Sequence, residues 1–347
     1  MHKTLKTISV GGGYFAQFHL EAWQRLPNIN LAAIVDTNAN TRDSLKKYFP
    51  EALVFDSLEK AARQVDADIV DLVTPPATHH SLIKTALKCC PKALIICQKP
   101  FCDSLSVATD TTALATQQGR EIVVHENFRF QPWYTKIKSL LNNKAVGQAL
   151  QVTFRLRPGD GQGVNAYLDR QPYFQQMKRF LIHETGVHWI DVFRYLLGEP
   201  NAVSADLRRI NPAIAGEDAG HFIFHYDNGL RAHFDGNRLL DHAADNTRHT
   251  MGEMMIEGTE GTITLNGDGE ISLRRFSNKA PQSIPYDFEL IGFGADCVRL
   301  LQAHVVDHLL HQTPLENKAS DYLQNLRIEE AIYTAVQSNS LISLGQE

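Results

Sequence analysis

The first 125 residues of the chain alternate between short apolar runs and longer segments in which apolar residues recur at helical spacing. This alternation is typical of a parallel sheet covered by helices. The apolar runs predict six buried strands, at 7–10, 31–35, 53–55, 68–73, 93–97 and 122–125. Helices are predicted between them, at 15–26, 44–48, 58–65, 79–88 and 104–119. Residues 1–127 are therefore expected to form a doubly wound, parallel α/β domain.

The pattern changes after residue 127. Apolar and polar residues now alternate along short strands, predicted at 203–210, 221–226, 230–234, 254–257 and 262–265. Turn residues such as Asp227-Asn228-Gly229 separate the strands, which favours antiparallel pairing. Further helices are predicted at 133–141, 186–197, 296–311 and 318–337. Residues 128–347 are thus expected to form a second, α+β domain around an open and mainly antiparallel sheet.

A glycine turn, Gly11-Gly12-Gly13-Tyr14-Phe15-Ala16, links the first strand to the first helix. Gly11 permits a tight turn, Gly13 lets a pyrophosphate approach the backbone, and Ala16 lets helix and strand pack closely. Asp36 ends the next strand, 23 residues after Gly13; a carboxylate there accepts the ribose hydroxyls of NAD and repels a 2′-phosphate. A glycine-rich hairpin turn is the alternative. The flanking strand, helix and acid favour a Rossmann domain that binds NAD in preference to NADP.

Composition and charge exclude several classes of function. Hydrophobic residues make up 43% of the 347 residues and charged residues 21%, as in soluble globular proteins. The net charge of −5 includes no basic stripe interleaved with aromatic residues, so nucleic acid is not an expected partner. No apolar run is long enough to cross a bilayer and no signal peptide is recognised, so the expected location is cytoplasmic. The five cysteines lack metal-type spacing and are expected to be reduced thiols.

In open parallel sheets, ligands bind beyond the carboxyl ends of the strands. This rule collects at one edge the segments Gly11, Asp36, Thr74-Pro75, Gln98-Lys99-Pro100 and His125-Glu126-Asn127. Lys99 stands between an apolar strand and Pro100, and proline disfavours a helical conformation for the residue before it. The Lys99 side chain is therefore expected near a cofactor, although a solvated lysine at a loop entrance fits its position equally well.

A second group of candidate residues lies in the run Leu181-Ile182-His183-Glu184-Thr185-Gly186-Val187-His188. His183 and His188 are five residues apart, about 140° around a helix, so they cannot share a metal from one face. No metal site is expected. Glu184 and His188 are four residues apart and share a face if the helix begins early enough. A carboxylate that orients an imidazole suits proton transfer at neutral pH, whereas a half-buried histidine bonded to a helix neighbour is the structural alternative.

Four motifs together resemble the glucose–fructose oxidoreductase/inositol dehydrogenase family, often called Gfo/Idh/MocA. They are the Gly11-x-Gly13-x-x-Ala16 turn, the run Thr74-Pro75-Pro76-Ala77-Thr78-His79, Lys99-Pro100 and Glu184-x-x-x-His188. Their order and spacing agree with the family over nearly the whole chain. The resemblance implies a nucleotide-binding domain before an open-sheet domain, and a cis bond between Lys99 and Pro100. It also implies that Lys99 and His188 flank the substrate carbon facing the nicotinamide, with an acid one turn before the histidine.

The resemblance also implies a set of cofactor contacts. They are Gly11, Gly13, Tyr14, Phe15, Ala16, Asp36, Thr37, Thr74, Pro75, His79, Gln98 and Lys99. The chain departs from the family pattern twice, with Gln98 in place of glutamate and Glu184 in place of aspartate. Gln98 removes a negative charge and so changes the electric field around Lys99. Glu184 has a side chain longer by one methylene than aspartate. The substrate and the preferred direction of the reaction therefore stay open.

These features predict an NAD-dependent oxidoreductase that transfers a hydride between nicotinamide and a hydroxyl-bearing carbon of a sugar, inositol or related polyol. His188 is expected to act as the base, Lys99 to steady the developing oxyanion, and Glu184 to complete the catalytic group. Two alternatives stay open. One is an enzyme with tightly bound NAD that cleaves or epimerises a glycoside by transient oxidation, and the other is a non-catalytic NAD-sensing protein. Family members commonly associate through the second sheet, so a homodimer or homotetramer is expected.

Contacts to a polyhydroxylated substrate are expected from the glycine-rich loop 157–163 and the residues after it. The loop carries hydrogen-bonding side chains, as a lid would, but a mobile surface turn has the same composition. The candidate contacts are Asn127, Arg129, Asp160, Tyr167 and Arg170, with Asn237 and Arg238 as weaker ones. Five scattered histidines are expected to be structural or solvent-facing: His221, His225, His233, His242 and His249.

Overall fold

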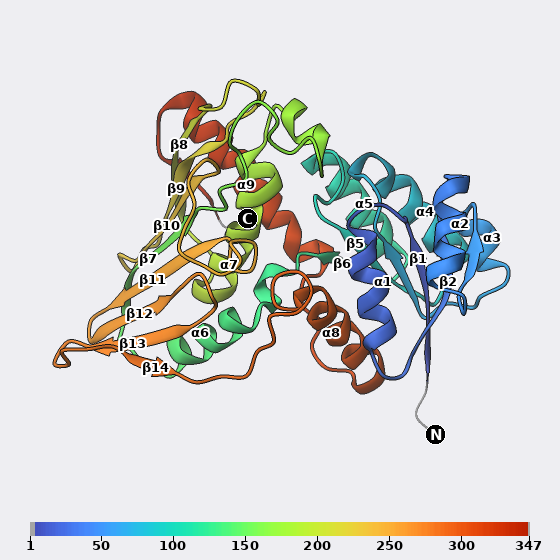
Figure 1. Ribbon diagram of the computed structural model, residues 1–347, viewed down its shortest axis with the longest axis horizontal. Helices are drawn as coiled ribbons and strands as arrows, with labels where there is room; N and C mark the ends of the chain where they lie inside the picture. Colours follow the sequence, from blue (N-terminus) through green and yellow to red (C-terminus); the bar gives the residue numbers. More distant parts are fainter. Residues whose placement is uncertain (1–3, 346–347) are drawn as a thin grey trace. The chain divides into compact units, whose positions relative to one another are not determined.

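The computed structural model describes residues 4–345. The chain divides into two compact units (Figure 1). One unit comprises the residues up to Asn127 together with Asp296–Gln324, and the other comprises Phe128–Ala295 together with the residues from Asn325 onward. The sequence analysis assigned everything after residue 127 to the second domain. Segment 296–324 belongs instead to the first unit, where helix α8 (Cys297–His311) packs against helix α1 (Ala16–Arg25).

The first unit is built around a six-stranded parallel sheet with the order β3-β2-β1-β4-β5-β6. Its strands are β1 (Leu5–Val10), β2 (Ile29–Val35), β3 (Leu53–Phe55), β4 (Ile69–Leu72), β5 (Leu94–Gln98) and β6 (Ile122–His125). Between them lie α1, α2 (Ala39–Tyr48), α3 (Leu58–Ala62), α4 (His79–Cys89) and α5 (Leu105–Gln117), coloured blue to green in Figure 1. The strand order reverses between β1 and β4, so the predicted doubly wound Rossmann fold is confirmed.

Local sequence explains where these elements begin and how they are buried. Helix α2 begins at Ala39 rather than at the predicted residue 44, because the Asn38 side chain caps it by accepting the N–H groups of Asn40 and Thr41. Every residue of β4, β5 and β6 is buried, as in a sheet with both faces covered. That burial includes the carboxylate of Asp71 in β4, which therefore needs hydrogen-bond partners inside the protein.

The second unit is built around a nine-stranded sheet with the order β14-β13-β12-β11-β7-β10-β9-β8-β15. Its strands are β7 (Ala149–Leu156), β8 (Ala202–Arg208), β9 (Ala219–His225), β10 (Arg231–Asn237), β11 (Gly252–Gly258), β12 (Gly261–Leu265), β13 (Ile271–Arg275), β14 (Gln282–Ile284) and β15 (Ile342–Ser343). The β7–β10 pair is parallel and the other pairs are antiparallel. The predicted open, mainly antiparallel sheet is therefore confirmed. Strand β7, which the sequence analysis missed, lies at its centre.

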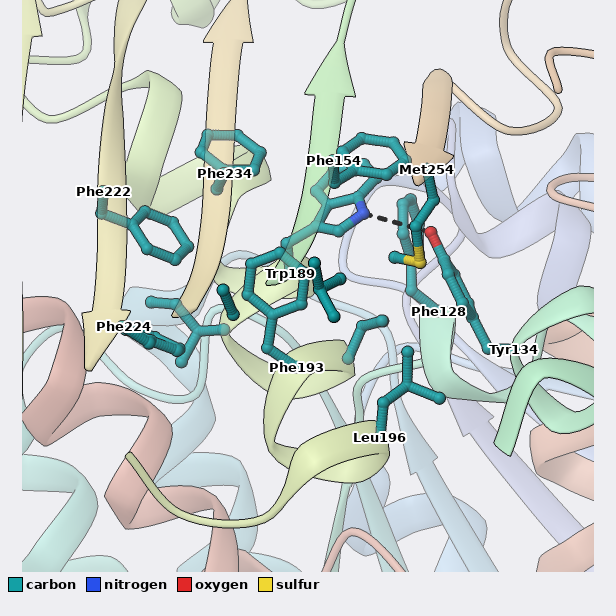
Figure 2. Packing of buried hydrophobic residues seen from close by; sticks show 14 of the residues in the cluster. Phe128, Tyr134, Phe154, Trp189, Phe193, Leu196, Phe222, Phe224, Phe234 and Met254 are labelled. Atoms are coloured by element: carbon teal, nitrogen blue, oxygen red, sulfur yellow. Dashed lines mark hydrogen bonds between the residues drawn. The ribbon is translucent and has the colours of Figure 1, made fainter. Parts of the chain in front are cut away.

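Helix α7 (Val187–Leu197) packs on one face of this sheet through aromatic side chains (Figure 2). The ring of Trp189 stacks on that of Phe154 with centroids 4.1 Å apart, and its indole N–H donates to the Tyr134 hydroxyl at 3.1 Å. Tyr134 belongs to helix α6 (Pro132–Asn142), so the same tryptophan joins α6, α7 and β7. The fully buried rings fix the orientation of α7 and of the residues at its amino end.

Candidate functional site

The glycine turn between β1 and α1 leaves open space at the amino end of the helix. Gly11 has a φ of +110°, and a Cβ there would collide with the carbonyl oxygen of Val73. A Cβ on Gly13 would meet no atom within 4 Å. Tyr14 beside it is 43% exposed, whereas Ala16 is buried. The turn therefore fits a dinucleotide pyrophosphate, because it offers room beside Gly13 and the N–H groups of the first helical turn.

Asp36, at the end of β2, is held against the glycine turn. Its Oδ2 accepts the N–H of Gly12 at 2.8 Å, and its Oδ1 accepts the N–H of Asn38 at 2.7 Å. The Arg42 guanidinium donates to the backbone carbonyls of Asp36 and Thr37, at 2.9 and 2.8 Å. The carboxylate is thus fixed beside the turn that would hold the pyrophosphate, as a ribose-binding acid must be.

The segment after β4 is held in place by its own side chains. The Nε2–H of His79 donates to the carbonyl of Thr74 at 2.8 Å, and the Thr78 hydroxyl donates to the carbonyl of Pro75 at 2.8 Å. Burial lowers the pKa of the His79 imidazole, so this histidine is neutral. Its ring is fully buried and contacts the loop backbone. His79 therefore shapes the Thr74-Pro75 segment, which was predicted to contact the cofactor.

Lys99 follows directly on β5 and is half-buried. Its bond to Pro100 is cis, as the family resemblance implied. The backbone N–H of Lys99 donates to Oε1 of Gln98 at 2.7 Å, and Nε2 of Gln98 lies 3.2 Å from Nε2 of His19. The ring of Phe15, another predicted cofactor contact, lies 5.6 Å from that of His19. The main chain of Lys99 is thus tied to a buried side chain of helix α1.

His188 lies in the first turn of α7 and is 6% exposed. Its imidazole stacks on the ring of Phe128, with centroids 3.7 Å apart and planes 2° from parallel. The next residue, Arg129, donates to both oxygens of buried Asp191 in α7, at 2.7 Å each, and Asn325 donates to the same carboxylate at 2.9 Å. The Arg129 guanidinium ties the Phe128 turn to the helix that carries His188. The predicted contact of Arg129 with substrate stays a prediction.

Glu184 lies in a π-helical turn, η4 (Leu181–Gly186), that precedes α7. The N–H of Val187 donates to the carbonyl of Ile182, five residues back, so the turn is wider than an α-helical one. The expectation that Glu184 and His188 share a face assumed that an α-helix extends back to Glu184. In the structure α7 begins at Val187, and Glu184 is half-buried. π-Helical turns occur frequently at functional sites.

Residues 4–345 contain no group of three or more His, Cys, Asp or Glu side chains that could hold a metal ion. His183, which the sequence analysis separated from His188, lies 2.7 Å from Glu329 through its Nδ1. Within the same described range, no helix has the length and apolar character needed to cross a membrane.

The loop after β7 is held by buried Arg238, which is 2% exposed. Its guanidinium donates to Asp160 Oδ2 at 2.8 Å, to the Tyr167 hydroxyl at 2.6 Å and to the Thr185 hydroxyl of η4. Arg170 donates to the same Asp160 oxygen at 3.1 Å. Burial alone would raise the pKa of the Asp160 carboxyl, but the Arg238 guanidinium holds it below its usual value. The side chains of Asp160, Tyr167 and Arg170, predicted to contact substrate, therefore form one ionic cluster.

A second contact anchors the same loop. The Asn211 side chain donates to the carbonyls of Gly161 and Gly163, both at 2.8 Å. The sequence left open a lid and a mobile surface turn. These contacts hold the loop against the rest of the unit, which a mobile surface turn would not require.

The last two substrate candidates each make one contact that the structure defines. The Asn127 amide donates to Sγ of Cys297 at 3.2 Å and is 3% exposed. Asn237 accepts the N–H of Leu239 at 3.0 Å through its side-chain oxygen.

In the structure, the predicted cofactor residues of the first unit lie at the carboxyl-terminal edge of its parallel sheet. Strands β1, β2, β4 and β5 end side by side, since Val10 pairs with Val35 and Leu72 while Leu72 pairs with Cys97. Sequence reasoning missed two buried residues behind this edge, His19 and Asp71. A signal for Asp71 was available, because an acid within an otherwise apolar strand must be satisfied internally.

Comparisons with known proteins agree with this arrangement. Residues 5–126 match the family described as "Oxidoreductase family, NAD-binding Rossmann fold", and residues 134–264 match "GFO/IDH/MocA C-terminal domain". Two D-apiose dehydrogenases are similar over nearly the whole chain. The protein from Paraburkholderia graminis is 27% identical over 99% of this chain and 90% of its own length. The protein from Rhizobium rhizogenes is 26% identical over 98% of both.

Solved structures show the same fold. An oxidoreductase from Agrobacterium radiobacter, in complex with NAD+, L-tartaric acid and magnesium, superposes with a TM-score of 0.87 at 25% identity, covering 98% of each chain. Levoglucosan dehydrogenase, in complex with NADH and levoglucosan, superposes with a TM-score of 0.82 at 18% identity, which is a likeness of fold alone. The family resemblance seen in the motifs is therefore confirmed. The chain belongs to the Gfo/Idh/MocA family of NAD-binding oxidoreductases.

Proposed function

We propose that this protein is an NAD-dependent dehydrogenase that transfers a hydride between the nicotinamide and a hydroxyl-bearing carbon of a sugar or related polyol. The observation that carries the proposal is the glycine turn with Asp36 fixed beside it by the N–H of Gly12. Family membership supports the reaction class, and similar proteins named D-apiose dehydrogenase and inositol 2-dehydrogenase support the substrate class. When bound, the nicotinamide supplies the hydride acceptor, and the protein supplies position and charge.

The preference for NAD over NADP is assigned to Asp36. Its carboxylate would accept the ribose hydroxyls of NAD and repel a 2′-phosphate. Arg42, a nearby cation, already donates to two backbone carbonyls. We expect kcat/KM to be higher with NAD, and Asp36→Ser to narrow the difference between the coenzymes. A wild-type preference for NADP would reject this assignment.

Proton transfer is assigned to His188, with Lys99 as its electrostatic partner and Glu184 as an accessory acid. An imidazole can take a hydroxyl proton and return it near neutral pH. The positive charge of Lys99 would stabilise the oxygen that becomes anionic as the hydride leaves. Stacking on Phe128 holds the plane of the His188 ring, so the base needs little reorientation.

The substrate class is tested most directly with purified protein. Coenzyme reduction is followed with NAD and with NADP against a panel of aldoses and polyols that includes D-apiose and inositol. We expect NADH to be released with at least one sugar or polyol. A changed sugar with an unchanged coenzyme balance would favour a tightly bound NAD that is only transiently reduced. Calorimetry that shows no uptake of either coenzyme would overturn the proposal.

Self-association is assigned to the outer face of the nine-stranded sheet. Ile223, His233, Thr153 and Met255 are register partners across β9, β10, β7 and β11, on the face opposite the buried Phe222, Phe234, Phe154 and Met254. Met255 is 45% exposed. We expect a homodimer or homotetramer by light scattering, and Met255→Lys to weaken it. A wild-type monomer at all concentrations would reject this assignment.

A further inference from the structure

A chain of buried polar side chains runs behind Lys99. The indole N–H of Trp23 donates to Asp71 Oδ2 at 2.7 Å, and Nδ1 of His19 lies 2.9 Å from the same oxygen. Nε2 of His19 lies 3.2 Å from Nε2 of Gln98, whose Oε1 accepts the backbone N–H of Lys99 at 2.7 Å. Trp23, His19 and Asp71 are fully buried, and Gln98 is 8% exposed. The chain thus crosses the interior of the first unit and ends on the backbone of Lys99.

Both ends of this chain are hydrogen donors, and this fixes every proton between them. A backbone N–H can only donate, so it must face Oε1 of Gln98, and the amide NH2 must face His19. Nε2 of His19 is then the acceptor, which leaves its proton on Nδ1. That proton is donated to Asp71, which also accepts the indole N–H of Trp23. A neutral imidazole with Nδ1–H satisfies the whole chain.

The groups packed around His19 fit this assignment. Asp71 is the acid that contacts it, from β4. From β6, the ring of His125 lies 4.1 Å from the His19 ring. From α8, the neutral amide of Gln302 donates to the His19 carbonyl at 3.2 Å. Asp71 is thus the acid in contact with the imidazole, and His125 is a second titratable group packed against it.

We propose that His19 and Asp71 are positioning residues for Lys99, that they act through the Gln98 amide, and that the Nδ1–H form of His19 requires an amide at residue 98. The effect on catalysis rests on the proposed role of Lys99. The proton assignment rests on hydrogen-bond geometry alone.

A glutamate at residue 98 would reverse one link of the chain. Its carboxylate could still accept the N–H of Lys99, but its second oxygen would face the lone pair on Nε2 of His19. The contact becomes favourable when the pair takes up one more proton. His19 is the stronger base and contacts Asp71, so it is the expected site of that proton, between two carboxylates. Gln98→Glu should therefore make the anchor of Lys99 depend on pH: it forms while His19 is protonated and fails as rising pH removes that proton.

The proton assignment is tested on the protein without coenzyme or substrate. The ¹⁵N imidazole signals of His19 are identified by their loss in His19→Asn. We expect the wild type to show a neutral ring with its proton on Nδ1, and Gln98→Glu to show a doubly protonated ring at neutral pH. A wild-type ring that is charged, or protonated on Nε2, would overturn the proposal even if Gln98→Glu failed to fold.

The positioning role is tested by pH profiles of kcat with a substrate found in the panel. In Gln98→Glu, kcat should fall about tenfold or more below wild type as pH rises from about 6 to 9, because the lysine anchor is lost. The double variant His19→Asn/Gln98→Glu is the matched control. It keeps the carboxylate that Gln98→Glu introduces and removes the imidazole whose proton is at issue.

Because the double variant has no imidazole at residue 19, its kcat should lack the fall with rising pH that Gln98→Glu shows. Equal profiles for wild type and Gln98→Glu, or a double variant that keeps the pH-dependent loss of the single variant, would overturn the positioning role. If wild type reduced no coenzyme with any substrate, the proposed function would fail while the NMR result still decided the proton assignment.

Discussion

Two buried polar clusters support the two candidate catalytic residues, and they are built on opposite principles. The first is the chain from Trp23 to Gln98, which ends on the N–H of Lys99. The second is the Arg238 cluster, defined by Arg238, Asp160, Tyr167, Arg170 and Thr185. It reaches the turn that precedes His188 through Thr185. The first cluster contains one acid and a fixed order of donors, whereas the second sets two guanidinium groups against one carboxylate.

This difference predicts how each cluster responds to change. In the first cluster, each hydrogen bond depends on which atom holds the proton. Exchanging an amide for an acid should therefore break a hydrogen bond, although the side chain keeps its shape. In the second, the Arg238 guanidinium keeps its charge, since its pKa is raised further by Asp160 against the effect of burial, and Asp160 is ionised over the neutral range. The second cluster should therefore be insensitive to neutral pH and sensitive to the deletion of a charge.

The largest effect is expected from His188→Ala. Loss of a positioned general base should lower the rate of hydride transfer about 10²–10⁴-fold. His225→Ala, on strand β9, is the control and should leave turnover near wild type. Single-turnover measurement of coenzyme reduction separates this step from product release. Near-normal turnover of His188→Ala would assign the proton to another group.

The next effect is on stability. Arg238→Met leaves the Asp160 carboxylate with Arg170 and the Tyr167 hydroxyl, and it removes the Arg238 donor from the Thr185 hydroxyl. Removing one partner of a buried ion pair costs about 3–5 kcal/mol of unfolding free energy. Arg170→Met is the matched control. Its side chain is 18% exposed, against 2% for Arg238, so its loss of unfolding free energy should be the smaller of the two. Urea unfolding of both variants measures the difference, and equal losses would contradict the central role of Arg238.

The sequence predicted the parts of the molecule that depend on local pattern. Runs of apolar residues located the six parallel strands. The glycine turn and Asp36 marked the edge of the sheet where a nucleotide is expected, which stays a prediction. Strand β7 was missed although Val152, Phe154 and Leu156 alternate with polar residues. Its parallel partner β10 lies far along the chain, so no hairpin pattern marks it.

The supporting clusters could not be predicted from local pattern. Arg238 is 78 residues from Asp160 and 53 from Thr185, and His19 is 52 from Asp71. No local pattern connects positions so far apart. The π-helical turn that carries Glu184 was also hidden, because the same residues fit an α-helix that begins three residues earlier than α7. The sequence thus named the candidate residues, whose roles stay predictions, and the tertiary structure shows the contacts that hold them.

A smaller effect should follow from Phe128→Leu. The stacked ring holds His188 by contact area and geometry rather than by hydrogen bonds, and an aromatic pair is worth about 0.5–1.5 kcal/mol beyond burial. If that energy orients the base, kcat should fall up to about tenfold while coenzyme affinity is unchanged. Phe193→Leu controls for lost core volume. Phe193 lies in α7, the helix that carries His188, but its ring packs against Phe222 and Phe224. Equal losses of kcat in both variants would show that packing, not ring orientation, is responsible.

The smallest effect is expected for pH changes near neutrality: they should not alter the contribution of the Arg238 cluster to the free energy of unfolding. Because the folded pKa of Asp160 lies below its usual value of about 3.9, its stabilising contribution is complete above that value and is lost as pH falls through the lower, folded one. The difference in unfolding free energy between wild type and Asp160→Asn should thus stay constant from about pH 6 to 9 and shrink below about pH 4. Gln98→Glu should lose kcat over that same neutral range, so the two profiles together assign any neutral-pH sensitivity to the chain behind Lys99. If that difference in unfolding free energy changed with pH near neutrality, the Arg238 cluster would contain a group that titrates there. The contrast between the two clusters would then be lost.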